Sequence, residues 1–168
     1  GGGEKWHFET ALGLAEKGFE ICSITGKGSV LADRLKANRI PTLSLKISKF
    51  SFLNPVKILA VCSYLKREKV DLAVFNSSLE VKIGVFASKF AGIKAMVYRR
   101  GSPTPIKPSL INKYIVKQIS CILCNSEATR SSLSGEKSWI NPGKVAVIYN
   151  GVSIPPSREK KIEGGTTK

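Results

Sequence analysis

The sequence has 168 residues and 42% of them are apolar, so the chain is long enough to bury one substantial hydrophobic core. It contains no apolar run near the roughly 20 residues of a membrane-spanning helix and no signal-peptide pattern, and we therefore expect a cytoplasmic domain. Its 27 basic residues against 12 acidic ones give a formal net charge of +15, which favours phosphorylated ligands, nucleic acid or anionic lipid surfaces as partners.

The spacing of apolar residues predicts alternating helices and strands. A helix follows the opening glycines and ends at Gly18, and Asn54-Pro55 is a typical helix start. Short apolar runs between the helices are typical of buried parallel strands. After the first helix we expect strands at 19–25, 42–47, 71–75, 94–98, 121–124 and 145–148, and helices at 29–37, 54–67, 79–91, 110–119 and 127–133.

This alternation predicts an α/β fold, a Rossmann-like doubly wound parallel sheet with helices on both faces. No strand precedes the first helix in the sequence, although the first strand is central in such sheets. We therefore expect a gap in the sheet and a domain that is part of a longer protein. The domain is placed at 1–156, and a polar linker or disordered tail at 157–168.

Ligands of open α/β sheets bind beside the loops that leave the carboxyl ends of the strands. A glycine run ahead of a helix also lets backbone N–H groups approach a phosphate. We therefore expect a pocket for a phosphate or diphosphate at this edge. Its candidate residues are Gly1, Gly2, Gly3, Asn76, Arg99, Arg100, Asn125, Asn150 and Gly151, with Lys46, Lys49 and Lys107 on the same edge.

Several of these features have a purely structural alternative. The opening glycines could be a cloning remnant, and Arg99-Arg100-Gly101 a surface turn. Asn150-Gly151 is a common turn pair, and Ser126 is best explained as a helix cap. We expect the sole histidine, His7, to be solvated or half-buried, and the four cysteines to be reduced core residues; we expect no metal site.

The segment from Lys46 to Leu53 combines cations with aromatic residues. Lys46, Lys49, Phe50 and Phe52 are candidates for contact with a membrane surface or an acceptor, together with Lys107. The alternative is that both phenylalanines pack in the core. The sequence therefore leaves two interpretations open for this segment, a surface that contacts a membrane or an acceptor, or side chains that belong to the hydrophobic core.

Four segments carry a resemblance to a known family. These are the start GGGEKWHFETALGLAEKGFEI, the strand VDLAV before Asn76, the segment LCNSEATR at 123–130, and KVAVIYNGV at 144–152. With them, residues 1–156 resemble the N-terminal domain of family 4 glycosyltransferases with the GT-B architecture. The last two segments are the most specific.

The resemblance implies a two-domain enzyme that moves a sugar to a glycolipid or polysaccharide acceptor with retention at the anomeric carbon. The N-terminal domain would bind the acceptor, and a second domain most of a UDP- or GDP-sugar donor, with no metal or other cofactor required. The glycine loop would lie against the donor diphosphate. Arg99 and Arg100 stand where many relatives have a histidine, and they are the candidate catalytic residues. We expect this chain to be inactive alone, and peripheral at the inner face of the membrane.

A different class of function fits the basic composition. The chain could be a nucleotide-binding or nucleic-acid-binding α/β module without catalysis. We expect no nucleic-acid partner, because the cations are not interleaved with aromatic residues on a strand platform and no nucleic-acid motif is present.

Overall fold

The computed structural model describes residues 2–134 and 138–151. In this part of the chain the helices are α1 (Gly2–Glu16), α2 (Val30–Ala37), α3 (Pro55–Arg67), α4 (Glu80–Ala91), α5 (Leu110–Gln118) and α6 (Glu127–Ser134), with 3₁₀ turns η1 (Ser51–Leu53) and η2 (Pro142–Lys144). The strands are β1 (Ser23–Gly26), β2 (Thr42–Leu45), β3 (Leu72–Phe75), β4 (Ala95–Arg100), β5 (Cys121–Cys124) and β6 (Val145–Val147). Gly1 and residues 152–168, and with them the predicted domain boundary and tail, lie outside the described residues.

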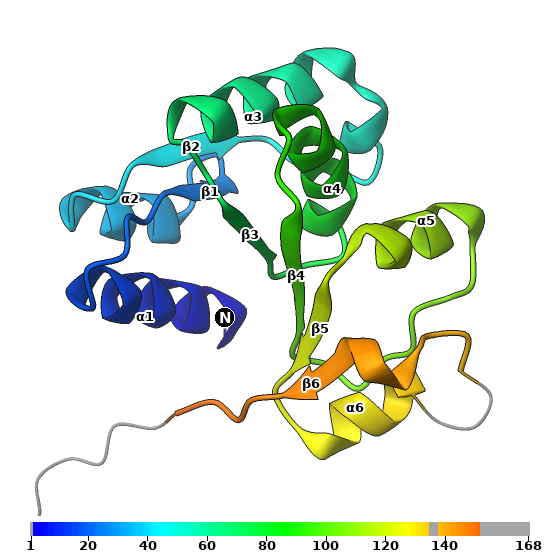
Figure 1. The fold of residues 1–168 in the computed structure, drawn as a ribbon. Coiled ribbons are helices and arrows are strands. Elements are labelled where there is room, and N and C mark those ends of the chain that lie inside the picture. Colours follow the sequence, from blue (N-terminus) through cyan, green and yellow to red (C-terminus); the bar gives the residue numbers. More distant parts are fainter. Residues whose placement is uncertain (1, 135–137, 152–168) are drawn as a thin grey trace, which may run out of the picture.

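All described strand pairs are parallel, as the alternation predicted (Figure 1). β1 pairs with β2, and β3, β4, β5 and β6 pair in that order in a separate four-stranded sheet. The α/β class and the parallel pairing are therefore confirmed. The sheet is divided between β1 and β3, which agrees with the predicted gap.

Local capping residues explain where several helices begin and end. Ser29 Oγ accepts a hydrogen bond from the Ala32 N–H at 3.2 Å, and Asn54 Oδ1 accepts one from the Lys57 N–H at 3.1 Å. Gly92 ends α4 in the left-handed conformation, with φ of 86°. These caps fix the helix boundaries close to those predicted from the sequence.

Three strand boundaries differ from the prediction by two residues or more, for the same physical reason. A strand extends only as far as its neighbour offers partners. β1 begins at Ser23 rather than residue 19, because its pairing with β2 starts at Thr42, and β2 ends at Leu45. β4 continues past Tyr98 to Arg100 because its last residues pair with β5.

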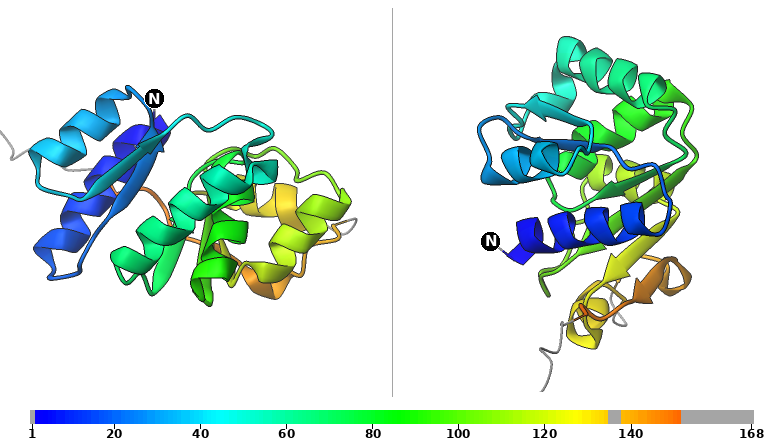
Figure 2. Two further views of the ribbon diagram at one scale, coloured as in Figure 1. Left: turned by 90° about the horizontal axis from the view of Figure 1, so that it is seen from above. Right: turned by 90° about the vertical axis from the view of Figure 1, so that its left-hand side faces the viewer.

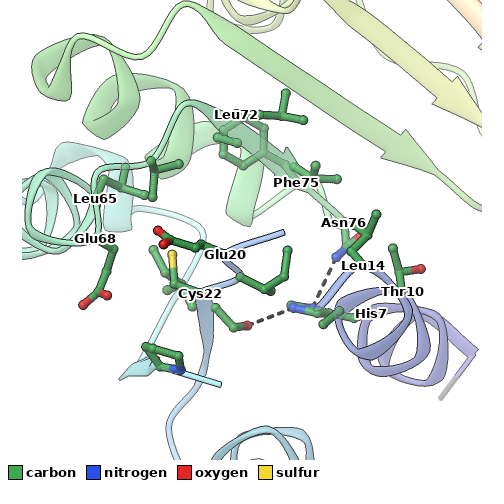
Figure 3. Close-up of a pocket in the computed structure, with 18 of the residues that line it drawn as sticks. His7, Thr10, Leu14, Glu20, Cys22, Leu65, Glu68, Leu72, Phe75 and Asn76 are labelled. Carbon is green, nitrogen blue, oxygen red and sulfur yellow. Dashed lines mark hydrogen bonds between the residues drawn. The ribbon is translucent and has the colours of Figure 1, made fainter. Parts of the chain in front are cut away.

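A large cavity separates the two sheets and is bordered by residues of α1, β1 and β3 (Figure 3). Its volume is about 980 Å³. At one border His7 of α1 hydrogen-bonds to the side chains of Ser23 and Asn76, 2.9 and 3.3 Å away. This half-buried histidine thus forms a polar link between β1 and the loop after β3, and its exposure agrees with the prediction.

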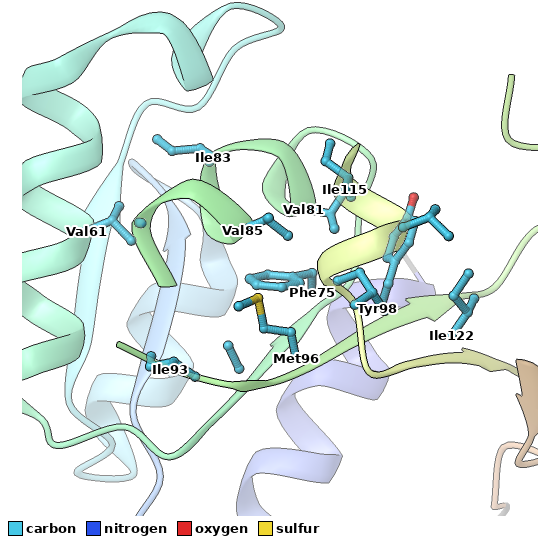
Figure 4. Packing of buried hydrophobic residues seen from close by; sticks show 14 of the residues in the cluster. Val61, Phe75, Val81, Ile83, Val85, Ile93, Met96, Tyr98, Ile115 and Ile122 are labelled. Carbon is cyan, nitrogen blue, oxygen red and sulfur yellow. The ribbon is translucent and has the colours of Figure 1, made fainter. Parts of the chain in front are cut away.

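The hydrophobic core is built in two parts. The larger cluster joins the four-stranded sheet to α3, α4 and α5, with Phe75, Met96 and Ile122 at its centre (Figure 4). A smaller cluster packs α1 on α2 through Phe8 and Leu35. The pair α1 and α2 therefore lies together, and α5 and α6 flank the other end of the molecule (Figure 2).

Candidate functional site

The candidate site lies at the carboxyl ends of β3, β4 and β5, where a pocket of about 450 Å³ opens. It is built from the start of α1, the end of β4 and the loops after β3, β5 and β6. Its lining residues are Gly2, Gly3, Asn76, Arg99, Arg100, Gly101, Ser102, Asn125 and Asn150. Seven of the nine residues proposed from the sequence for a phosphate pocket therefore come together here.

Arg99 is the most buried cation of this pocket, with 5% of its surface exposed. Its guanidinium carbon lies 4.1 Å from the centre of the Trp6 ring, and Nη2 donates to Asn150 Oδ1 at 3.2 Å. Burial lowers the pKa of the Arg99 guanidinium from its ordinary value. No carboxylate pairs with it among the described residues, so this charge can still gain an anionic partner.

Arg100 is held by its own strand and the loop that follows. Nη1 donates to the Tyr98 hydroxyl at 3.0 Å, and Nη2 donates to the Thr104 carbonyl. Its Nε is buried and has no hydrogen-bond partner among the described residues. Arg100 thus borders the pocket, with two of its five N–H donors held by protein oxygens and its buried Nε–H without a partner among the described residues.

The position of the two arginines corrects the sequence analysis. They were expected in a loop after a strand that ends at residue 98, but both belong to β4. Successive strand residues point to opposite faces. Arg99 accordingly turns toward Trp6 of α1, whereas Arg100 turns toward Tyr98 on its own strand.

Gly2 and Gly3 form the first turn of α1 and are not a loop ahead of it. The first N–H groups of a helix have no partner within the helix, and in α1 this end borders the pocket. The start of the helix therefore adds backbone donors and the positive end of the helix dipole to the arginines. Gly1 was assigned the same role from the sequence, but it lies outside the described residues.

The three asparagines proposed for this edge line the pocket with different partners. The Asn76 side chain reaches His7, while its N–H donates to Glu80 Oε2 at 3.2 Å. Asn125 Oδ1 accepts a hydrogen bond from the Thr129 hydroxyl at 3.1 Å. Asn150 holds Arg99, as described above. Beside them, Ser126 caps α6 by accepting from the Thr129 N–H, as predicted.

Other predicted edge residues lie outside this pocket. Gly151, Lys46, Lys49 and Lys107 are exposed and do not line it. The reason is that the segment after β2 runs away into η1, and the loop after β4 carries Lys107 beyond the strand ends.

The segment before α3 presents a separate basic and apolar surface. Phe50 is 65% exposed and Leu53 is 66% exposed, beside the exposed cations Lys46 and Lys49. Phe52 is different, because it is half-buried and stacks on Phe86 with ring centres 6.2 Å apart. Each of the two alternatives therefore holds for one phenylalanine, since Phe50 lies at the surface and Phe52 packs against the core.

The candidate residues named from the sequence leave out two residues that line the pocket, Gly101 and Ser102, both in the loop after β4. They also leave out Trp6, which does not line the pocket but whose ring covers Arg99. Trp6 follows the glycines within the first turns of α1, but nothing in its spacing identifies a partner 93 positions along the chain. Only the packing of α1 beside β4 brings them together.

The described part of the chain contains neither a membrane-spanning helix nor a metal-binding cluster. No helix in it is long and apolar enough to cross a membrane. Within the same residues, no group of three or more His, Cys, Asp or Glu is placed to hold a metal ion.

Comparison with known proteins gives a family match and several similar folds. The family model Glycosyltransferase Family 4 matches residues 1–154. A glycosyltransferase from Rickettsia africae ESF-5 is 22% identical with a TM-score of 0.70, over 89% of this chain and 39% of that one. Anabaena Alr3699/HepE, in complex with UDP and glucose, is 19% identical with a TM-score of 0.66, over 90% and 41%. Acinetobacter baumannii MurG is 18% identical with a TM-score of 0.53, over 74% and 38%. This chain thus spans about two fifths of each; a comparison with curated proteins gave no match.

Proposed function

The chain belongs to glycosyltransferase family 4, and from this premise we propose that it is the acceptor-side domain of an enzyme that transfers a sugar from a nucleotide-sugar donor. The transfer would retain the anomeric configuration and use a UDP- or GDP-sugar, as the family resemblance implies. The acceptor is a glycolipid or polysaccharide. Support for a nucleotide-sugar comes from Anabaena Alr3699/HepE, which has this fold and was solved with UDP and glucose.

The observation that carries the proposal is the convergence of positive groups in the pocket at the strand ends. Arg99, Arg100 and the first turn of α1 all border it. A departing nucleoside diphosphate gains negative charge as the sugar bond breaks, and fixed donors stabilise that charge without reorganising. We assign these groups to the diphosphate of the donor or to an anionic group of the acceptor.

Trp6 provides a direct test, because its ring lies on Arg99. The chain has two tryptophans, so a Trp139→Phe variant leaves Trp6 as the reporter. The variant is titrated separately with pyrophosphate, UDP-glucose and GDP-mannose. We expect a saturable change in Trp6 fluorescence with pyrophosphate and with one of the two nucleotide-sugars. Arg99→Met should weaken that binding about 10- to 100-fold, the usual effect of losing a charged hydrogen bond.

The matched control is Arg34→Met, because Arg34 also lies over an aromatic ring, that of Phe8, with its guanidinium carbon 3.8 Å from the ring centre. It changes the net charge equally but lies in α2, away from the pocket. Equal losses in the two variants, or no saturable change with pyrophosphate, would remove the proposed role of Arg99.

We also propose that the surface before α3 meets an anionic membrane leaflet at the inner face of the cell membrane. Its support is the exposure of Phe50 and Leu53 beside Lys46 and Lys49. The double variant Lys46→Glu and Lys49→Glu should bind phosphatidylserine vesicles at least about tenfold less tightly in a sedimentation assay, since each cation contributes about 1 kcal/mol. The control is the double variant Lys113→Glu and Lys117→Glu, which changes the net charge of the chain by the same amount at two exposed residues of α5. An equal loss of vesicle binding in this control would show that net charge alone, and not the surface before α3, determines binding.

A further inference from the structure

Gly101, the first residue after β4, is a glycine that the fold itself does not require. Its φ lies outside the left-handed region that favours glycine. Apart from its chain neighbours, a Cβ atom placed on it would meet nothing closer than 3.4 Å, an ordinary van der Waals distance. Alanine would therefore fit here, and it would reduce the conformational entropy of the unfolded chain. Glycine at this position is explained when the space beside it has to stay open for a ligand.

Three side-chain nitrogen atoms surround this space. The point where a Cβ of Gly101 would stand lies 3.4 Å from Arg99 Nη1, 3.8 Å from Arg99 Nη2 and 3.7 Å from Asn125 Nδ2. Hydrogen bonds from such nitrogens to oxygen are about 2.7–3.2 Å long. An oxygen atom that binds these nitrogens would therefore stand close to the same point, and a Cβ atom and this oxygen could not both occupy it.

The hydrogens on these nitrogens are largely available to a ligand. Among the described residues, the hydrogen bond of Arg99 runs from Nη2 to Asn150 Oδ1, which leaves both Nη1 hydrogens and one Nη2 hydrogen unused. Asn125 Nδ2 donates to no described residue. The described residues that line the pocket include no aspartate or glutamate, so no carboxylate of the lining competes for these donors.

The fold fixes the direction of the Asn125 amide. The Asn125 backbone N–H donates to the Arg100 carbonyl at 3.2 Å, where β4 and β5 end side by side, and this places Asn125 next to Gly101. Asn125 Oδ1 accepts from the hydroxyl of the buried Thr129 at 3.1 Å. Because Thr129 holds the oxygen, the nitrogen end of the amide faces Gly101 and Arg99. A donor that is already oriented loses less entropy when a ligand binds.

We propose that Gly101 keeps open a binding position for one phosphate oxygen, which accepts hydrogen bonds from Arg99 and Asn125. This assignment rests on the proposed function, since the phosphate would belong to the diphosphate of the nucleotide-sugar or to a phosphate group of the acceptor. Arg99 supplies the positive charge, and Asn125 supplies a neutral donor from a neighbouring strand end. Gly101 is thus a specificity-determining residue, because even the methyl group of alanine would exclude the phosphate oxygen.

The test measures binding of inorganic phosphate and pyrophosphate by Trp6 fluorescence in the Trp139→Phe chain, in which Trp6 is the only tryptophan. Gly101→Ala should weaken the binding of both anions about 10- to 100-fold, the usual effect of losing charged hydrogen bonds. The Tm of this variant should stay the same or rise slightly, because the added Cβ atom fits the space that the ligand would take.

A matched control and a second variant complete the test. Gly26 ends β1, lies outside the pocket and has nothing within 4 Å of an added Cβ, so Gly26→Ala should leave anion binding unchanged. Asn125→Asp keeps an oxygen for the Thr129 hydroxyl and replaces Nδ2 with a carboxylate oxygen. It should weaken phosphate binding at least about tenfold, and it tests the proposal even where Gly101→Ala does not fold.

Pyrophosphate binding as tight in Gly101→Ala or in Asn125→Asp as in the original chain would overturn the proposal. An equal loss in Gly26→Ala would overturn it as well, because the effect would then not depend on the space beside Gly101.

Titrations with UDP-glucose, GDP-mannose and octyl phosphate, a lipid-like phosphate monoester, identify the source of the phosphate. Weaker binding of a nucleotide-sugar in Gly101→Ala assigns the position to the donor, and a loss confined to octyl phosphate assigns it to the acceptor. If pyrophosphate binding depends on Gly101 and no nucleotide-sugar binds, the proposed function is wrong and the phosphate position stands. If none of the phosphate compounds binds, both proposals are wrong.

Discussion

Gly84 in the middle of α4 lies directly against the Phe75 ring of β3. A Cβ atom at this position would lie 2.2 Å from Phe75 Cε1 and 2.7 Å from Cδ1, whereas unstrained carbon contacts are about 3.5–4.0 Å. Gly84→Ala therefore requires the ring or the helix to move by about 1.3 Å, which is the difference between this distance and the shortest unstrained contact. Overpacking of this kind costs about 1–3 kcal/mol.

Two opposing contributions set the net effect of Gly84→Ala. Alanine in a helix interior is more favourable than glycine by about 0.5–1 kcal/mol. Phe75 also borders the cavity between the sheets, so its ring has room to yield and the overpacking cost should fall near 2 kcal/mol or below. We expect a net loss of about 1 kcal/mol in the free energy of unfolding.

Gly13 of α1 is the matched control, because nothing lies within 4 Å of a Cβ placed there. Gly13→Ala gains the helix preference without the clash and should stabilise the chain by about 0.5–1 kcal/mol. The assay is urea unfolding followed by circular dichroism, with the m-value checked for each variant. Opposite signs for the two variants are the expected result.

A double-mutant cycle identifies Phe75 as the cause. Phe75→Leu should cost less in the Gly84→Ala background than in the original chain, because the smaller side chain relieves the contact. If Gly84→Ala is as stabilising as Gly13→Ala, or if the two substitutions at 84 and 75 are additive, the close contact does not govern stability and the reasoning is wrong.

Two further predictions concern buried polar contacts. Asn76 Nδ2 donates to Nδ1 of His7, so neutral His7 donates from Nε2 to Ser23, and burial lowers the pKa of His7. As pH falls below the unfolded-state value of about 6.5, the unfolded chain binds the proton first, and stability should fall by at most about 1.4 kcal/mol per pH unit. Urea unfolding at pH 5.5 and 7.5 should show this loss in the original chain. In the His7→Gln variant the free energy of unfolding should not fall between the two pH values for this reason, and a variant with the same pH dependence as the original chain would contradict the assignment to His7. The Lys144 ammonium donates at 2.9–3.2 Å to three carbonyls at the end of α5, those of Val116, Lys117 and Ile119. Lys144→Met should therefore lower the free energy of unfolding by about 1–3 kcal/mol, measured by thermal or urea unfolding. The control Lys113→Met, at an exposed lysine, should give no measurable change.

Local signals in the sequence were sufficient for the order and type of the elements. The side chains of Ser29 and Asn54 cap helices, and Gly92 supplies the left-handed residue that ends α4. Each of these acts within a few residues, so its effect can be read without knowing the fold. Short apolar runs between such helices then indicate parallel strands, and all described strand pairs are parallel.

The pocket at the strand ends was predictable in part. The carboxyl edge of a parallel sheet gathers the loops that follow its strands, and this rule brought together Asn76, Asn125 and Asn150. It could not exclude Lys46 or Lys107, because a long side chain in a loop can turn toward the edge or away from it. Loop direction depends on packing beyond the neighbouring residues.

The amino-acid sequence by itself determined the α/β class, the parallel pairing and the edge at which charge gathers, since these follow from local periodicity and capping. The tertiary structure alone decided that β4 carries Arg99 and Arg100 within a strand, and that Trp6 covers one of them. Strand ends depend on how far a neighbouring strand offers hydrogen bonds, and the contact with Trp6 depends on how α1 packs. Both depend on contacts between segments that are distant in the chain, and a local sequence pattern carries no information about such contacts.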